Sequence, residues 1–131
     1  MVLAGCGNEK EPPPEDTMTL KEQFERAVSE GVVKNVAFAE WLTAMTREYE
    51  SREQNIFEKV FIFRGEWKKR MVYFRHNKYD STLFFNVFYE DGERIRWTED
   101  APLKDFKSTS KNWQLIFEWG YGEYDFIIFS L

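Results

Sequence analysis

The chain has few of the residues that build disulfides, metal centres and phosphate sites. Its 131 residues include one cysteine and one histidine, so neither an internal disulfide nor a transition-metal cluster of recognisable spacing is expected. A phosphate-binding glycine loop is also missing, because Gly120 and Gly122 flank Tyr121 at a predicted turn. The sequence therefore predicts no metal and no cofactor.

Positive charge is in deficit as well. The chain has 18 Lys and Arg against 23 Asp and Glu, which gives a formal net charge of −5. Binding to nucleic acid depends on a cationic surface that neutralises phosphates, so we expect no nucleic-acid partner. No apolar run is long enough to predict a transmembrane helix.

Aromatic side chains are in excess. They make up 18% of the chain, with 13 Phe, 6 Tyr and 5 Trp. Such side chains suit the half-buried surface of a pleated sheet, and the length leaves room for one compact domain with one core. We therefore expect a single sheet-rich domain over residues 19–131.

The N-terminus has the form of a lipoprotein processing site. Leu3, Ala4 and Gly5 run directly into Cys6, and small residues before a thiol are what the processing peptidase and diacylglyceryl transfer require. A secretory signal also carries an apolar region of roughly 7–15 residues. Residues 1–6 are accordingly interpreted as the remnant of such a signal with lipid attached to Cys6; the alternative is an isolated thiol in a polar tail.

Residues 7–18 are expected to form a flexible tether. They are polar and include three consecutive prolines, Pro12 to Pro14, a composition that keeps a chain extended at about 3 Å per residue. Two acyl chains anchor a protein stably in a membrane. The predicted location is thus the outer side of the cell membrane, reached through a lipid anchor.

Two helices are expected at the start of the domain. Thr19 and Glu22 have the capping-box spacing, in which each side chain accepts a hydrogen bond from a free backbone N–H, and the apolar spacing predicts a helix over residues 19–30. Apolar residues recur at intervals of three and four from Phe38 to Tyr49, which predicts a second, core-facing helix.

From residue 56 onward the apolar period shortens to two. We expect strands over residues 56–63, 67–74, 82–89, 94–97, 112–119 and 124–129. Tight turns are predicted at residues 64–66 and at Asp91-Gly92, where the Asp-Gly pair is a strong hairpin signal. Loops are predicted at residues 76–81 and 104–111. Alternation over residues 112–119 predicts that Trp113, Leu115, Phe117 and Trp119 share one face.

The predicted fold class is α+β, with N-terminal helices packed on one side of a curved antiparallel β-meander. The other side of the sheet would then be lined as a pocket or covered by a partner, because exposed aromatic surface marks an interaction site. Trp97, Trp119 and Tyr121 lie next to polar or turn positions. We predict that these three are exposed anchors for a partner.

Two further groups invite a chemical role. His76 precedes Asp80 by four residues, a spacing from which a general acid/base dyad could be built, but a solvated loop histidine is the better interpretation. Lys68, Lys69 and Arg70 form a short basic run, interpreted as a solvated strand edge that discourages pairing. We therefore predict no catalytic residues and no enzymatic activity.

The Leu-Ala-Gly-Cys start at Cys6, the polar tether, the N-terminal helical segment and the aromatic meander together resemble the small cystatin-like-fold lipoproteins of Gram-positive bacteria. Some of that group belong to integrative conjugative elements and act in exclusion, which blocks redundant transfer. The resemblance implies a non-enzymatic protein that binds another protein at the cell surface, with a component of a conjugation machine as the partner. The alternative is an NTF2-like domain with an aromatic pocket for a small molecule.

Overall fold

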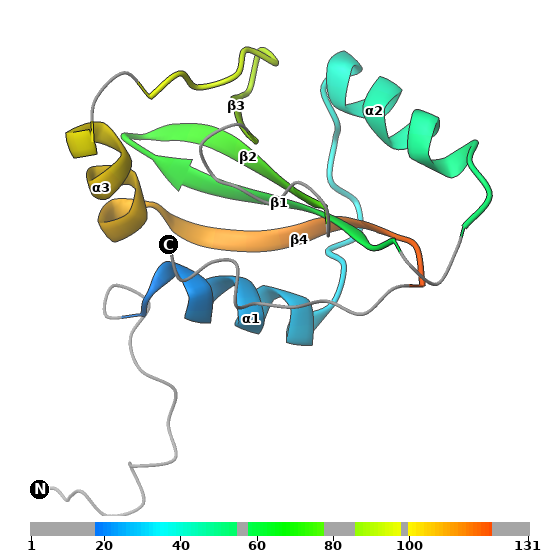
Figure 1. The fold of residues 1–131 in the computed structure, drawn as a ribbon, viewed down its shortest axis with the longest axis horizontal. Coiled ribbons are helices and arrows are strands. Elements are labelled where there is room, and N and C mark those ends of the chain that lie inside the picture. The colour runs from blue at the N-terminus through cyan, green and yellow to red at the C-terminus, as the bar shows by residue number, and fades with distance from the viewer. Residues whose placement is uncertain (1–17, 55–57, 78–85, 98–99, 122–131) are drawn as a thin grey trace, which may run out of the picture.

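The chain folds into a four-stranded antiparallel sheet with helices against both faces and at one end (Figure 1). The structure is a computed structural model that describes residues 18–54, 58–77, 86–97 and 100–121. The elements in chain order are α1 (Leu20–Glu30), α2 (Glu40–Glu50), β1 (Val60–Trp67), β2 (Arg70–Asn77), β3 (Val87–Tyr89), α3 (Asp100–Thr109) and β4 (Lys111–Trp119). The α+β class is confirmed. The predicted lipid site Cys6, residues 7–17 of the predicted tether and the strand at 124–129 lie outside the described residues.

The strand order is β3-β2-β1-β4. Strands β1, β2 and β3 follow one another as a meander, whereas β4 returns after α3 to pair with the free side of β1. The segment after the Asp91-Gly92 turn returns along β3, where Phe88 bridges Arg94 and the Ile95 N–H donates to the Val87 carbonyl at 2.8 Å. The predicted hairpin is therefore present, with a short return.

Helix α1 begins as its sequence predicts. The Glu22 N–H donates to the Thr19 hydroxyl at 3.1 Å, and the Thr19 N–H donates to the Glu22 carboxylate at 2.9 Å, which completes the capping box. From this fixed start the helix buries Phe24 between the rings of Phe63 and Trp113, at centroid distances of 4.6 and 5.0 Å. The capping box thus sets the register that packs α1 on the sheet.

Helix α2 lies on the opposite face from α1. Leu42 packs with Ile62, Tyr73 and Ile116, while Phe24 of α1 packs with side chains from the other face of the same strands. The prediction that both helices cover one side is wrong. Apolar residues on both sides of β1 and β2 required two covers, and each helix supplies one.

Strand β4 changes face at a bulge. Ile62 pairs with Phe117 and the next residue, Phe63, pairs with Leu115, so Ile116 is an extra residue in the ladder. Leu115 consequently packs on the α1 side and Phe117 on the α2 side. The predicted single apolar face over residues 112–119 is wrong beyond this point, because simple alternation does not survive an inserted residue.

Strand β1 continues through the residues predicted to turn. Gly65 pairs with Val72 in mid-strand, and the indole of Trp113 lies where a Cβ at Gly65 would be. Glycine here provides room for an aromatic ring rather than a turn. The turn falls at Lys68 and Lys69, whose φ angles are 52° and 62°, so the prediction of a basic strand edge is also wrong.

Helix α3 replaces the predicted loop over residues 104–111. Its apolar content is small: Leu103 and Phe106, one turn apart, are the residues that pack on the core. Ser108 and Thr109 donate hydroxyl hydrogen bonds to the Lys104 and Asp105 carbonyls. Such a short, polar helix is stabilised by its place against the sheet rather than by its own sequence.

Candidate functional site

The structure separates the three predicted interface residues. Trp97 exposes 6% of its surface and Trp119 exposes 4%, so the prediction that both are exposed is wrong. Trp97 packs against the rings of Trp67 and Phe106, with centroids 5.6 and 5.3 Å apart. Tyr121 exposes 69%, as an anchor for a partner must, and its role in binding stays a prediction.

Tyr121 stands directly after a tightly fixed piece of backbone. Gly120 has a φ of 96° and packs so closely on the backbone of Glu58 that a side chain has no room there. The ammonium group of Lys59 donates to the Gly120 carbonyl at 3.0 Å and pairs with the Glu118 carboxylate. The exposed tyrosine therefore starts from a rigid base, which lowers the entropic cost of using it in an interface.

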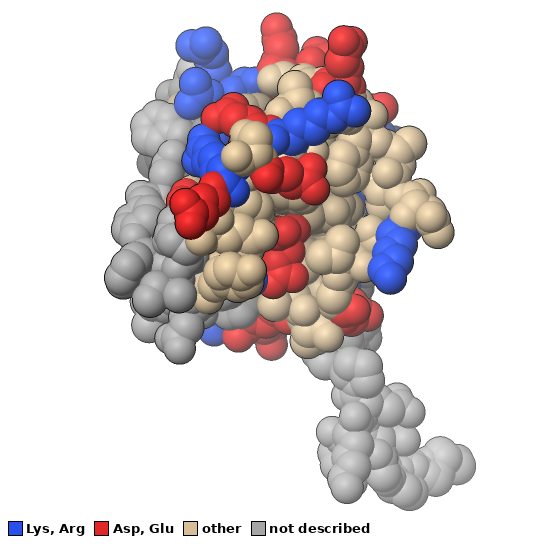
Figure 2. Space-filling view, turned by 90° about the vertical axis from the view of Figure 1, so that its right-hand side faces the viewer, with Lys and Arg blue, Asp and Glu red and all other residues tan. Residues whose placement is uncertain are grey.

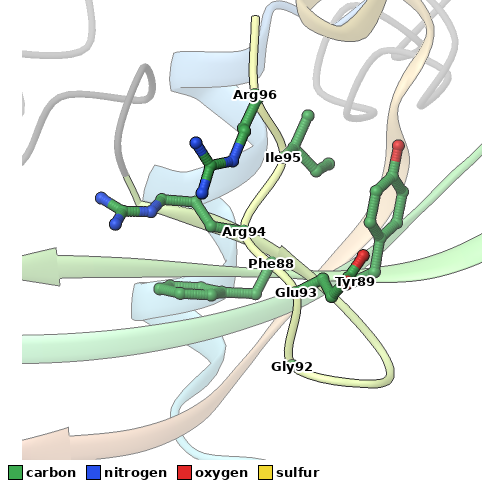
Figure 3. A pocket seen from close by; sticks show the side chains of 7 residues that line it. All are labelled: Phe88, Tyr89, Gly92, Glu93, Arg94, Ile95 and Arg96. Atoms are coloured by element: carbon green, nitrogen blue, oxygen red, sulfur yellow. The ribbon is translucent and has the colours of Figure 1, made fainter.

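A groove lies on the hairpin that follows β3 (Figure 3). Its volume is about 640 Å³, and it is lined by Phe88, Tyr89, Gly92, Glu93, Arg94, Ile95 and Arg96. Phe88, Arg94 and Arg96 point to one side of the hairpin, and Tyr89 and Ile95 point to the other. Both arginines are exposed. We call Phe88, Arg94 and Arg96 the hairpin site.

Hydrogen bonds within the hairpin and from helix α2 hold the hairpin in place. Within it, the Gly92 N–H donates to the Tyr89 carbonyl at 2.9 Å, and the Glu93 N–H donates to the Asp91 carboxylate at 2.9 Å. From α2, the indole N–H of Trp41 donates to the Glu90 carbonyl at 2.8 Å. The site is thus mounted on a backbone that has little freedom to move.

Aromatic packing supports the same hairpin from below. The Trp41 ring lies 5.6 Å from Phe88 and 5.5 Å from Tyr73, measured between centroids, and it covers Gly92, where a Cβ would come within 2.9 Å of the indole. Burial, reinforced by the charge of Glu90, raises the pKa of Tyr73 above its ordinary value. The ring of Phe88 thus packs against Trp41 and stays partly exposed.

Guanidinium groups and an aromatic ring on a fixed surface suit recognition of another polypeptide. Arginine and aromatic residues dominate the binding energy of protein interfaces, and a guanidinium binds carboxylates with two parallel hydrogen bonds. Arg70, on β2, stacks over the ring of Tyr89 with its central carbon 3.9 Å from the ring centroid, but Tyr89 points to the side of the hairpin away from Arg94 and Arg96.

His76 does not lie in a loop. It is a β2 residue that exposes 1% of its surface, between the rings of Phe61 and Phe74 at centroid distances of 6.5 and 6.2 Å. The interpretation as a solvated turn residue is wrong, since β2 extends to Asn77. Asp80 lies outside the described residues, so the proposed dyad is not seen.

In the described part of the chain, no group of three or more His, Cys, Asp and Glu side chains is arranged to hold a metal ion. None of the helices that the structure describes is both long and apolar enough to cross a membrane.

The hairpin site was within reach of the sequence. Asp91-Gly92 fixes the turn, and alternation after it places Arg94 and Arg96 on one side and Ile95 and Trp97 on the other. The two arginines therefore point away from Trp97, which was predicted to be an exposed anchor. The expectation that aromatic residues near turns are exposed did not identify these arginines. It selected Trp97 instead, and Trp97 is buried because helix α3 packs over it.

Comparison with family models, with curated proteins and with solved structures found no match for this chain.

Proposed function

We propose that this protein is a non-enzymatic lipoprotein, anchored through Cys6, that binds another protein at the cell surface through the hairpin site. The observation that carries the proposal is the placement of Phe88, Arg94 and Arg96 on one side of a groove of about 640 Å³. Exclusion in conjugative transfer is the specific role that we propose for the complex.

A protein partner fits the site better than an enclosed small molecule does. The groove is formed by a single hairpin and has exposed guanidinium groups in its wall, whereas sites for apolar ligands bury most of the ligand surface. The face of the sheet that could line such a pocket is filled in the described residues by Phe24, which exposes none of its surface and contacts three rings.

Capture of the partner tests the site. A photo-crosslinking residue in place of Arg96 should yield a discrete crosslinked protein in cells that carry the conjugation machine, and the same residue in place of Lys34, exposed and distant in the chain, should not. The double variant Arg94→Ala/Arg96→Ala should weaken binding of the identified partner at least tenfold, about the loss of one good charged contact. Equal crosslinking from both positions would refute the site.

Transfer frequency tests the role. Recipient cells that produce the protein should receive the element less often than cells without it, and Arg94→Ala/Arg96→Ala should restore transfer while protein levels stay equal. Cys6→Ser should release the protein from the membrane fraction and also restore transfer. Unchanged transfer into producing cells would refute exclusion. In a separate measurement, a shift of the melting temperature on addition of apolar compounds would favour the alternative of a small-molecule pocket.

A further inference from the structure

The hairpin that carries the site gains little stability from its own strand pairing. Strand β3 has three residues, and the segment that returns along it contributes one isolated bridge, between Phe88 and Arg94. The Tyr89 N–H donates to the Glu93 carbonyl at 2.8 Å and closes the loop over residues 90–92. Because a pairing this short is marginal in water, the conformation of the hairpin depends on contacts from other elements.

Buried side chains fix the base of the hairpin but not its turn. Ile95 and Trp97 expose 5% and 6% of their surfaces, and both belong to the core on the α1 face. In the turn, by contrast, Asp91 and Glu93 are exposed. Burial therefore holds the segment that carries the arginines, and the turn needs a different support.

One side chain of helix α2 supplies that support. Trp41, the second residue of α2, donates its indole N–H to the Glu90 carbonyl at 2.8 Å, across 49 positions of the chain. The same indole covers Gly92, where a Cβ would come within 2.9 Å of the ring, and its centroid lies 5.6 Å from that of Phe88. A single ring thus contacts both the turn and the aromatic residue of the hairpin site.

The start of α2 gains from the same contact. Its N-cap residue, Ala39, makes no side-chain hydrogen bond, so the first turn lacks the side-chain acceptor that usually fixes a helix start. The ion pair between Arg52 and Glu48, at 2.7 Å, lies at the other end of the helix. Figure 2 views the molecule from that other end, where acidic and basic side chains lie next to one another. At the N-terminal end of α2, the hydrogen bond of Trp41 ties the helix to the hairpin.

We propose that Trp41 is the positioning residue of the hairpin site, whose N–H holds the turn closed and so keeps Phe88 aligned with Arg94 and Arg96. The inference rests on the proposed function of that site. A ring alone could slide along the turn, whereas a directional hydrogen bond to one carbonyl fixes the place of the ring. A site ordered before binding holds its partner more tightly than one that must be ordered by it. Because coupling between two contacts is reciprocal, displacement of Trp41 from Glu90 would also favour release of the partner.

Amide hydrogen exchange tests this role without a partner. Benzothienylalanine at position 41 keeps the shape of tryptophan and has sulfur in place of the N–H. In the full chain with this residue, the amides of Tyr89, Gly92 and Glu93 should exchange about fivefold faster, since one hydrogen bond that resists opening of the turn is lost. The amides of β1 and β2 should keep their rates within about twofold. Unchanged exchange in the turn, or equal acceleration throughout the sheet, would overturn the proposal.

The same isostere at position 67 is the matched control. The indole N–H of Trp67 donates to the Asp105 carboxylate at 3.0 Å, so this replacement also removes one hydrogen bond and keeps the ring, but away from the turn. The amides of Gly92 and Glu93 should then exchange within about twofold of the wild-type rate. An acceleration as large as that from position 41 would show a general loosening of the fold and would overturn the proposal.

Capture of the partner tests whether the position of the hairpin matters for binding. With the photo-crosslinking residue in place of Arg96, Trp41→Phe keeps a ring over Gly92 but removes the donor, and it should reduce the yield of crosslinked partner about threefold or more at equal protein level. Tyr49→Phe, at the other end of α2, should leave the yield unchanged. No crosslink from the parent would refute the hairpin site and this inference with it. A yield that Trp41→Phe leaves unchanged would refute the positioning role alone.

Discussion

The two faces of the sheet differ in how completely their side chains are buried. On the α1 face, Phe24 touches three rings, and Phe63 and Phe74 expose none of their surface. On the α2 face, Leu42 is as well buried, at 1% exposure, but its neighbours Trp41 and Phe88 are only partly covered. One face is closed by its own chain, and the other is closed over only part of its area.

This difference assigns the two faces different tasks. Beyond Ile62 on the α2 face, the positions of β1 are polar: Arg64 donates to Gln114 at 3.2 Å and Glu66 accepts from Asn112. Phe88 belongs to the same face, and Arg94 and Arg96 point to its side. We infer that the α1 face supplies most of the stability, whereas the α2 face bears the surface for recognition.

The largest loss of stability should follow truncation on the α1 face. Phe24→Ala should lower the free energy of unfolding by about 3–5 kcal/mol, since the ring leaves a cavity between rigid neighbours. Urea unfolding followed by circular dichroism measures it, and the control Phe24→Leu, which removes less of the side-chain volume, should lower the free energy of unfolding by less than Phe24→Ala does. A small loss from Phe24→Ala would mean that the α1 face is not the main source of stability.

Truncation on the α2 face should cost less. Leu42→Ala should lower the free energy of unfolding by about 2–3 kcal/mol, the lower part of the range for buried leucines, because the partly exposed side chains around it can move into the space. The same variant should also loosen Trp41 and so weaken partner capture at the hairpin site. Losses equal to those of Phe24→Ala would contradict the distinction between the faces.

Sequence patterns correctly predicted the helices and turns that depend on residues close together in the chain. The capping box of Thr19 and Glu22, the helical stripe up to Tyr49 and the Asp91-Gly92 turn depend on residues within a few positions of one another, and all three are present. The boundaries of β1 were not predictable in this way. Gly65 by itself predicts a turn. Its place in the middle of β1 depends on Trp113, 48 residues later in the chain, whose indole packs on it.

The candidate site was lost for a related reason. Burial of Trp97 depends on α3, and α3 has too few apolar residues to be recognised without the sheet it packs on. The extra residue Ile116 likewise leaves the alternating pattern of residues 112–119 intact in the sequence while it divides their side chains between two faces. Tertiary packing decided both outcomes, and neither has a short-range signature.

The N-caps of helices α1 and α2 allow a further comparison of the two faces, with a smaller expected change in the free energy of unfolding. Thr19 caps α1 with its side chain, whereas Ala39 has the same extended backbone at the start of α2 but no side-chain hydrogen bond. Thr19→Ala should cost about 1 kcal/mol of stability, and Ala39→Ser should add about 0.5–1 kcal/mol. Thermal melts of both variants provide the check. A neutral Ala39→Ser would show that the α2 start is already satisfied by other groups.

The smallest effect concerns pH and the α2 face. Burial, reinforced by the charge of Glu90, raises the pKa of Tyr73 in the folded protein above the ordinary value of 10.0, so above that pH the unfolded chain loses this proton more readily. The contribution of neutral Tyr73 should therefore be complete below pH 10 and decline as pH rises beyond it. Urea midpoints at pH 8 and pH 11 should fall less for Tyr73→Phe than for the wild type, while Tyr121→Phe, which removes an exposed hydroxyl, should follow the wild type. Equal declines in all three proteins would show that the hydroxyl of Tyr73 stays hydrated, and the α2 face would then be more open than its packing indicates.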